Sequence, residues 1–348
     1  MKKSLLLLLL LIGSCFVVQA APKPTYKIAW TIYAGTMPLG YAQEHGILKK
    51  WGDKYGFDLE AIQLNDYMEA QTQFTAGQLA ASVAMTLDAL TIPASSGVDT
   101  TILMPLSTSA GSDGIIMKGK QSQLSDIKGK TINLVELSGS HYMLDRALAS
   151  VGLNERDVHL VNTSDSDISA IFADANSDVV VTWKPQLSAI LNQFPDASLV
   201  YDSSKIYGEI VDGMMIRTEL LKQEPNLGKA IIGAWYETMG ILQNQHDPRH
   251  QEMMSYMAEA LNTDLKGLKS QLATIDFFTP AQGIHYVRSN DFKLKMTQIA
   301  HFAFAHGLLG ETAPNAQYIG IEAGDDQVIG NASNLKLRFP AKWMEQAQ

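Results

Sequence analysis

Cysteine and arginine are the scarcest informative residues in this 348-residue chain. The single cysteine, Cys15, lies near the N-terminus, so the rest of the chain has no disulfide framework, cysteine zinc site or thiol nucleophile. Arginine occurs six times, and the formal net charge is −9. An acidic chain with few arginines lacks the basic surface that nucleic acids and anionic lipids require, so we expect neither as a partner.

Motifs for common catalytic and nucleotide-binding machinery are also missing. The sequence has no GxGxxG, Walker A, HExxH or GxSxG segment. The run Ser138-Gly139-Ser140-His141 places hydroxyls beside an imidazole, but it is more typical of a turn in which Ser140 caps the following helix. We therefore expect a protein that is not an enzyme and has no cofactor and no metal site.

Long apolar runs are confined to the N-terminus. Lys2 and Lys3 precede an apolar run over residues 5–12, and Val18-Gln19-Ala20 has the small residues of a cleavage site. The run is shorter than the roughly 20 residues needed to span a bilayer, which predicts a signal peptide over 1–20 and a periplasmic protein. The segment ending at Cys15 also loosely resembles a lipidation site, but the residues after Cys15 are apolar, where a lipoprotein tether is usually polar.

From Tyr26 onward, short β-branched segments alternate with amphipathic stretches, which predicts an α/β protein with parallel strands. Beyond about Arg217 we expect helices alone. The expected strands are Tyr26–Ile32, Phe57–Gln63, Leu79–Met85, Thr100–Leu106, Gly114–Met117, Thr131–Val135, Val158–Val161, Val179–Thr182, Ser198–Tyr201 and Gly213–Arg217.

The pattern contains no flexible linker, which favours two lobes joined by structured crossings. We expect lobe 1 to combine residues 21–112 with 213–348, and lobe 2 to span 113–212. The crossings are predicted near 114–120 and 209–217. Ligands of open α/β sheets bind at the carboxyl ends of the strands, so a ligand is expected between the lobes, with closure by a hinge motion.

Aromatic, hydroxyl and carboxylate side chains follow the predicted strands. For Asp66 and Asp88 a role as helix N-cap is an equal alternative, and Trp30 could equally be a core residue. The candidate ligand-binding residues are Trp30, Tyr33, Asp66, Asp88, Glu136, Ser138, His141 and Trp183.

This set has carboxylates but no arginine, so it would repel an anion such as nitrate, phosphate or a sulfonate. Carboxylates and aromatic rings instead suit a small cation, through hydrogen bonds and cation–π contacts. They also suit urea, whose amide hydrogens are all donors. The acidic cleft that these carboxylates would form favours guanidinium modestly over urea, because a carboxylate attracts the charge before desolvation is counted.

Several segments resemble ABC-importer solute-binding proteins of the nitrate/sulfonate/taurine group, and are most similar to the urea-carboxylase-associated proteins that bind urea or guanidine. The resemblance covers nearly the whole chain after the leader. It implies a periplasmic type II binding-protein fold and delivery of a small nitrogen compound to an ABC permease and its ATPase. Thr86 departs from the amide expected in many relatives. The matching segments are Gly40–Leu48, Thr75–Gln78, Asn65–Tyr67, Asp88–Pro93, Asn133–Ser138, Thr182–Trp183, Gly233–Met239, His306–Gly310 and Leu335–Phe339.

Two alternatives remain within this resemblance. One is a binding protein of the same fold for a small anion such as taurine, another sulfonate or nitrate. The other is an enzyme similar to those of thiamine-pyrimidine synthesis, which use a cysteine-rich iron motif that this chain does not supply after Cys15. In the favoured interpretation the protein is a monomer whose lobes close on the ligand.

Overall fold

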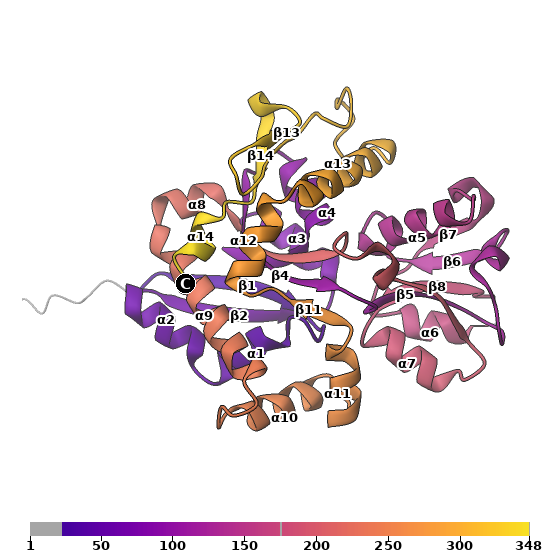
Figure 1. Cartoon of the computed structure of the whole chain (residues 1–348), viewed down its shortest axis with the longest axis horizontal. Coiled ribbons are helices and arrows are strands. Elements are labelled where there is room, and N and C mark those ends of the chain that lie inside the picture. The colour runs from indigo at the N-terminus through magenta and orange to yellow at the C-terminus, as the bar shows by residue number, and fades with distance from the viewer. Residues whose placement is uncertain (1–22, 175, 348) are drawn as a thin grey trace, which may run out of the picture.

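The structure is a computed structural model that describes residues 23–174 and 176–347. The predicted signal peptide and Cys15 lie outside these residues. Two β-sheets stand side by side, each flanked by helices (Figure 1). No helix in the described ranges combines the length and the apolar composition needed to cross a bilayer.

The larger sheet has nine strands, in the order β13-β12-β14-β4-β10-β3-β1-β2, with β11 paired to β4. Strand β10 is antiparallel to both β3 and β4, whereas β1 is parallel to β2 and β3. The bounds are β1 Thr25–Thr31, β2 Asp58–Leu64, β3 Ala81–Met85, β4 Thr100–Ser109, β10 Val211–Arg217, β11 Ile275–Phe277, β12 Gly320–Glu322, β13 Val328–Ile329 and β14 Leu335–Arg338.

The smaller sheet has five strands, in the order β7-β6-β8-β5-β9. Strand β6 is parallel to β7 and β8, whereas β5 is antiparallel to β8 and β9. Both sheets are therefore mixed, which corrects the expectation of parallel strands. The bounds are β5 Asp113–Met117, β6 Thr131–Leu134, β7 His159–Asn162, β8 Val179–Trp183 and β9 Ser198–Asp202.

The chain passes between the sheets twice. It leaves β4 at Ser109 and enters β5 at Asp113, then leaves β9 at Asp202 and re-enters the larger sheet at Val211. The crossing predicted at 114–120 is therefore three residues, 110–112, because residues 114–117 belong to β5. The return crossing, 203–210, overlaps only the start of the predicted range 209–217.

The ten predicted strands are all present, with shifts of one to three residues at most ends. The expectation that strands cease after Arg217 was wrong, since β11 to β14 all follow it. These strands have two to four residues, too few for an alternating pattern to emerge in the sequence. They are held by neighbours distant in the chain, as where β11 pairs with β4.

Helices surround both sheets (Figure 1). The stretch from Leu39 to Trp51 forms two helices, because Gly46 has a φ of 71° and interrupts it. The main helices are α1 Met37–Glu44, α2 Ile47–Tyr55, α3 Tyr67–Thr75, α4 Thr86–Ala89, α5 Gly139–Ser150, α6 Ile168–Ala173, α7 Gln186–Gln193, α8 Thr218–Gln223, α9 Pro225–Gln243, α10 His250–Ala260, α11 Leu265–Leu272, α12 Pro280–Arg288, α13 Asn290–Ala305 and α14 Lys342–Glu345.

Candidate ligand-binding site

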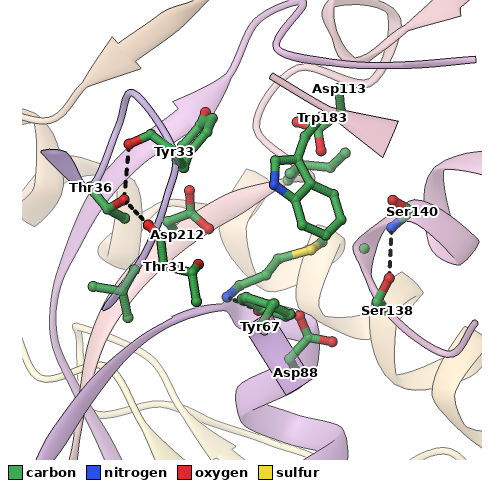
Figure 2. Close-up of a pocket in the computed structure, with 14 residues that line it drawn as sticks. Thr31, Tyr33, Thr36, Tyr67, Asp88, Asp113, Ser138, Ser140, Trp183 and Asp212 are labelled. Atoms are coloured by element: carbon green, nitrogen blue, oxygen red, sulfur yellow. Dashed lines mark hydrogen bonds between the residues drawn. The ribbon is translucent and has the colours of Figure 1, made fainter. Parts of the chain in front are cut away.

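A cavity of about 70 Å³ lies between the two sheets (Figure 2). This is several times the roughly 10–15 Å³ that one water molecule requires, so the cavity has room for a ligand of a few heavy atoms. Its lining comprises Thr31, Tyr33, Thr36, Tyr67, Val83, Met85, Asp88, Asp113, Ser138, Gly139, Ser140, Trp183, Ile210 and Asp212.

Strand ends position most of this lining. Thr31, Met85 and Trp183 are the last residues of β1, β3 and β8, at the carboxyl ends where α/β sheets bind ligands. Asp113 begins β5 and Asp212 is the second residue of β10. Because these two strands are antiparallel to their neighbours, their beginnings lie at the same edge as the other strands' ends.

Asp88 enters the pocket from α4 and is held by Tyr67. The Tyr67 hydroxyl donates to Asp88 Oδ2 at 2.6 Å and accepts the Met85 backbone N–H at 3.0 Å. Asp88 is 1% exposed, and its Oδ1 has no hydrogen-bond partner among the described residues. A buried carboxylate oxygen without a donor is costly, so the pocket is prepared for a ligand that donates to it.

Three carboxylates share the pocket without a cationic side chain. Burial raises the pKa of Asp88 to about 7 and that of Asp113 to about 6. Burial, and then the charges of Asp113 and Asp88, raise the pKa of Asp212 to about 7. No lysine, arginine or histidine is among the lining residues. The pocket therefore takes up protons near neutral pH when no cation is bound.

Aromatic rings line the pocket from both sheets. Tyr33 follows β1, and burial raises the pKa of its hydroxyl well above the usual value. Trp183 packs edge-on against Tyr67, with ring centroids 6.0 Å apart. Such faces can hold a cation, and this ring pair brings the smaller sheet into contact with α3 of the larger one.

The N-terminus of α5 faces the pocket as well (Figure 2). Ser138, rather than Ser140, is the N-cap: its hydroxyl donates to the Val135 carbonyl at 2.7 Å and accepts the Ser140 N–H at 3.2 Å. Ser140 lies one position inside the helix, and its Oγ is buried without a partner in the described chain. This hydroxyl is a second unpaired polar group available to a ligand.

A family model matches residues 36–236, more than half of the chain, and its description is NMT1/THI5-like. The chain belongs to the NMT1/THI5-like family. A candidate binding protein from Brucella abortus is 24% identical over 212 residues, covering 58% of this chain and 61% of that one. The taurine-binding periplasmic protein of Escherichia coli is 26% identical over 144 residues, covering 40% of this chain and 44% of that one.

Solved structures resemble this NMT1/THI5-like chain over most of its length. The alkanesulfonate-binding protein SsuA from Xanthomonas axonopodis pv. citri, bound to MOPS, gives a TM-score of 0.69 at 17% identity, covering 84% of this chain and 96% of that one. The periplasmic nitrate-binding protein NrtA from Synechocystis PCC 6803 gives 0.65 at 12% identity, with coverage of 93% and 88%. These neighbours confirm the predicted fold class, an α/β type II periplasmic binding-protein fold.

Four of the eight candidate residues line the pocket of this family member: Tyr33, Asp88, Ser138 and Trp183. Trp30 and Asp66 do not. Side chains alternate along a strand, so Trp30 lies on the face of β1 opposite to Thr31, packed near Gly40 of α1. Asp66 caps α3 by accepting the Glu69 N–H at 2.7 Å.

The other two candidates, Glu136 and His141, also lie outside the lining. The backbone N–H of Glu136 donates to Asn162 Oδ1 at 3.0 Å, and its partly exposed side chain has no hydrogen bond among the described residues. His141 is in the first turn of α5 and contacts Glu155 instead.

Residues that the sequence interpretation missed include Asp113 and Asp212. Both stand at the start of a strand, Asp113 as the first residue of β5 and Asp212 as the second of β10, whereas ligand-binding residues were expected after the strands. Recognising that β5 and β10 run antiparallel to their neighbours would have placed both aspartates at the pocket edge. Tyr67 was missed for another reason: it stands in the first turn of a helix, and only packing directs its hydroxyl to Asp88.

Proposed function

We propose that this chain is the periplasmic solute-binding component of an ABC importer and delivers a small nitrogen compound to a permease and its ATPase. Family membership and the likeness to solute-binding proteins support this role. The predicted signal peptide agrees with a periplasmic location. In this proposal the protein is not an enzyme, and it acts as a monomer.

The two sheets with their helices are the two lobes, in this proposal. The boundaries are those expected from the sequence, 21–112 with 213–348 for lobe 1 and 113–212 for lobe 2, except that residues 211 and 212 belong to β10 of the larger sheet and so to lobe 1. The lining comes from both, as with Asp88 of α4 and Asp113 of β5, so a ligand bridges the lobes. Ligand contacts present only when the lobes are closed stabilise that state.

The ligand we favour is a small cation, and guanidinium fits it best. The observation that carries this choice is the trio Asp88, Asp113 and Asp212, of which the first two are buried and the third is partly exposed, with no lysine, arginine or histidine in the lining. A cation about 4 Å from one carboxylate gains on the order of 4 kcal/mol at an effective dielectric near 20, before desolvation. Urea is the neutral variant, donating N–H groups to the same oxygens.

A second candidate is a small anion such as taurine, another sulfonate or nitrate. The names of the relatives favour it, since they bind taurine, alkanesulfonate and nitrate. The N-terminus of α5 with the unpaired Ser140 hydroxyl offers donors to an anion. Three ionised aspartates would repel it, so anion binding requires them to be protonated.

Calorimetric titration with guanidinium, urea, taurine and nitrate tests this assignment. Guanidinium should bind with micromolar affinity, urea more weakly, and nitrate not at all. Asp88→Asn should weaken guanidinium at least tenfold more than it weakens urea, because it removes a charge and keeps the shape. Glu136→Gln is the matched control, since it removes a carboxylate near α5 that is outside the lining.

Selective binding of taurine or nitrate would overturn the cation proposal and establish the second candidate. Equal losses of guanidinium and urea binding in Asp88→Asn would show that the carboxylate acts only as a hydrogen-bond acceptor. An equal effect of Glu136→Gln and Asp88→Asn would mean that the overall negative field, and not the pocket, attracts the ligand.

A further inference from the structure

A cluster of two histidines and a glutamate lies outside the pocket lining. Glu155 Oε1 is 2.8 Å from His141 Nε2 and 2.7 Å from His306 Nε2. His141 belongs to α5, and Glu155 begins a 3-10 turn ahead of β7, so both lie among the elements of the smaller sheet. His306 ends α13, which packs on α4 and α12 beside the larger sheet (Figure 1). We call these three residues the histidine clasp.

The hydrogen bonds of the clasp fix where its protons are. His141 Nδ1 accepts the Leu137 backbone N–H at 3.0 Å, so the proton of a neutral His141 is on Nε2, facing Glu155. His306 Nδ1 is 2.8 Å from the Phe302 carbonyl oxygen, which can only accept, so this nitrogen carries a proton. A second proton on His306 Nε2 is needed for its bond to Glu155. With Glu155 ionised, both of these hydrogen bonds form together only when both ring nitrogens of His306 carry a proton.

The surroundings favour a positive charge on His306. His306 is the C-cap of the 16-residue helix α13, where the helix dipole stabilises a cation. The hydrogen bond from His141 holds the pKa of Glu155 at about 2, against the opposing effect of burial. Asp145 is another acidic group close enough to interact electrostatically with His141, His306 and Glu155. Arg146 in turn interacts with the charge of Asp145.

The same proton assignment argues against a metal ion. The three ligand atoms lie within 4.8 Å of one another, which is compact enough for one ion. A ligating Nε2 must present a lone pair, but the Leu137 N–H occupies Nδ1 of His141 and leaves the proton on Nε2. Only Glu155 and His306 would remain as ligands, too few for a zinc site.

We propose that the histidine clasp is a proton-dependent latch that holds α13 against α5 and so keeps the two halves of the molecule closed. Loss of one proton from His306 removes the attraction between its charge and that of Glu155, and it removes one of the two hydrogen bonds that His306 donates, to Glu155 or to the Phe302 carbonyl. His141 follows Ser140 directly, so the latch also sets the position of the α5 N-terminus at the pocket. Its effect on ligand affinity rests on the proposed function, whereas its effect on closure does not.

Closure can be followed by the distance between two spin labels without any ligand. Cysteines replace the exposed residues Lys222 of α8 and Gln193 of α7 in a Cys15→Ser background, which leaves no other cysteine. The distance distribution is recorded from pH 5 to pH 9, the range in which histidines titrate. His306→Phe keeps an aromatic ring beside Phe302 and removes both protons; His301→Phe, at an exposed site on the same helix, is the control.

We expect the wild type and His301→Phe to shift from a short to a longer distance as the pH rises. His306→Phe should have a several-fold smaller short-distance population at pH 5 and a weaker pH dependence. The pocket carboxylates also titrate, but they do so in all three proteins, so the difference between the curves isolates the clasp. Superimposable curves for wild type and His306→Phe would overturn the proposal.

Zinc chloride added alone provides a second discriminating arm. One equivalent should leave the distance distribution of the wild type unchanged at pH 7. If the short distance appears only with zinc and is lost in His306→Phe, the cluster is a metal site and the latch proposal is wrong. Failure of guanidinium to bind would contradict the favoured ligand of the proposed function. It would not change the distances between the labels, so the two failures are distinguishable.

Discussion

Asp88 is the residue at which burial, hydrogen bonding and charge act against one another. Burial raises its pKa from 3.8 to about 7, while the bond from Tyr67 opposes that rise. A raised carboxyl pKa means that the folded state holds the proton more tightly than the unfolded state. The associated stability is present below pH 3.8 and is lost as the pH rises to about 7.

Asp88→Asn should therefore stabilise the unliganded protein at pH 8. Each pKa unit corresponds to about 1.4 kcal/mol, so the gain is at most about 4 kcal/mol. Asparagine keeps an acceptor for the Tyr67 hydroxyl. Thermal unfolding at pH 8 and pH 4 measures the effect, which should vanish at the lower pH. If the variant is instead destabilised at pH 8, ionisation of Asp88 does not destabilise the folded protein.

Tyr67→Phe tests how much the hydrogen bond from Tyr67 to Asp88 stabilises the fold. It leaves Asp88 Oδ2 without its donor and the Met85 N–H without its acceptor. Leaving buried polar groups unpaired should lower the free energy of unfolding by about 1–3 kcal/mol in urea denaturation. Tyr207→Phe is the control, because the exposed Tyr207 hydroxyl bonds Asp276 at the surface and should matter little. Equal losses of stability in the two variants would show that the buried Tyr67 hydroxyl contributes no more than the exposed Tyr207 hydroxyl.

At the scale of elements, the contact between α5 and β3 sets the pocket mouth. A Cβ on Gly139, the first residue of α5, would lie 2.4 Å from Met85 Sδ at the end of β3. The first turn of α5 therefore lies directly against the Met85 side chain. The N-terminus of α5 and the carboxylate of Asp88 can then face one cavity.

Gly139→Ala should weaken binding of the small ligand at least tenfold by displacing the Met85 side chain, which also lines the pocket. Its effect on thermal unfolding should be small, because the sulfur is at the flexible end of its side chain. Gly240→Ala in α9 is the control: nothing lies within 4 Å of the added carbon, and alanine should stabilise the helix by up to about 1 kcal/mol. Unchanged affinity in Gly139→Ala would show that the Met85 side chain can move without altering the binding site.

Elements were predictable from the sequence where the local pattern was strong. Strand β8, with the run Val179–Trp183, is buried along nearly its whole length and reads as a continuous apolar segment. Short strands such as β11 and β13 were not, because their pairing partners alone define them. Half of the candidate site residues line the pocket. Of the others, Asp66 caps a helix, Trp30 lies on the far face of a strand, and Glu136 and His141 lie beside the N-terminus of α5 but outside the lining.

Across the whole molecule, the acidic pocket contrasts with the ligands in the names of similar proteins. Those proteins are named for taurine, an alkanesulfonate and nitrate, whereas the lining of this chain has three carboxylates and no cationic side chain. The sequence indicated the acidic character through Asp88 but not through Asp113 or Asp212. Asp113 and Asp212 reach the pocket because β5 and β10 run antiparallel to their neighbours. That direction depends on pairing with strands elsewhere in the chain, which the local sequence does not show.

The pH dependence of affinity separates these possibilities. A cation needs ionised carboxylates, and the pKa values of Asp88 and Asp212 are raised to about 7. Its affinity should therefore rise with pH from 5 to 8, and binding at pH 6.5 should release protons. An anion would be repelled by the ionised carboxylates, so its affinity should fall over the same range and its binding should take up protons.

Calorimetric titration of guanidinium at pH 5 and pH 8, repeated at pH 6.5 in two buffers of different ionisation enthalpy, decides whether the pocket binds a cation. Binding should be at least tenfold tighter at pH 8, and it should release protons at pH 6.5. Tighter binding at pH 5, or proton uptake on binding, would contradict a pocket built around three ionisable aspartates.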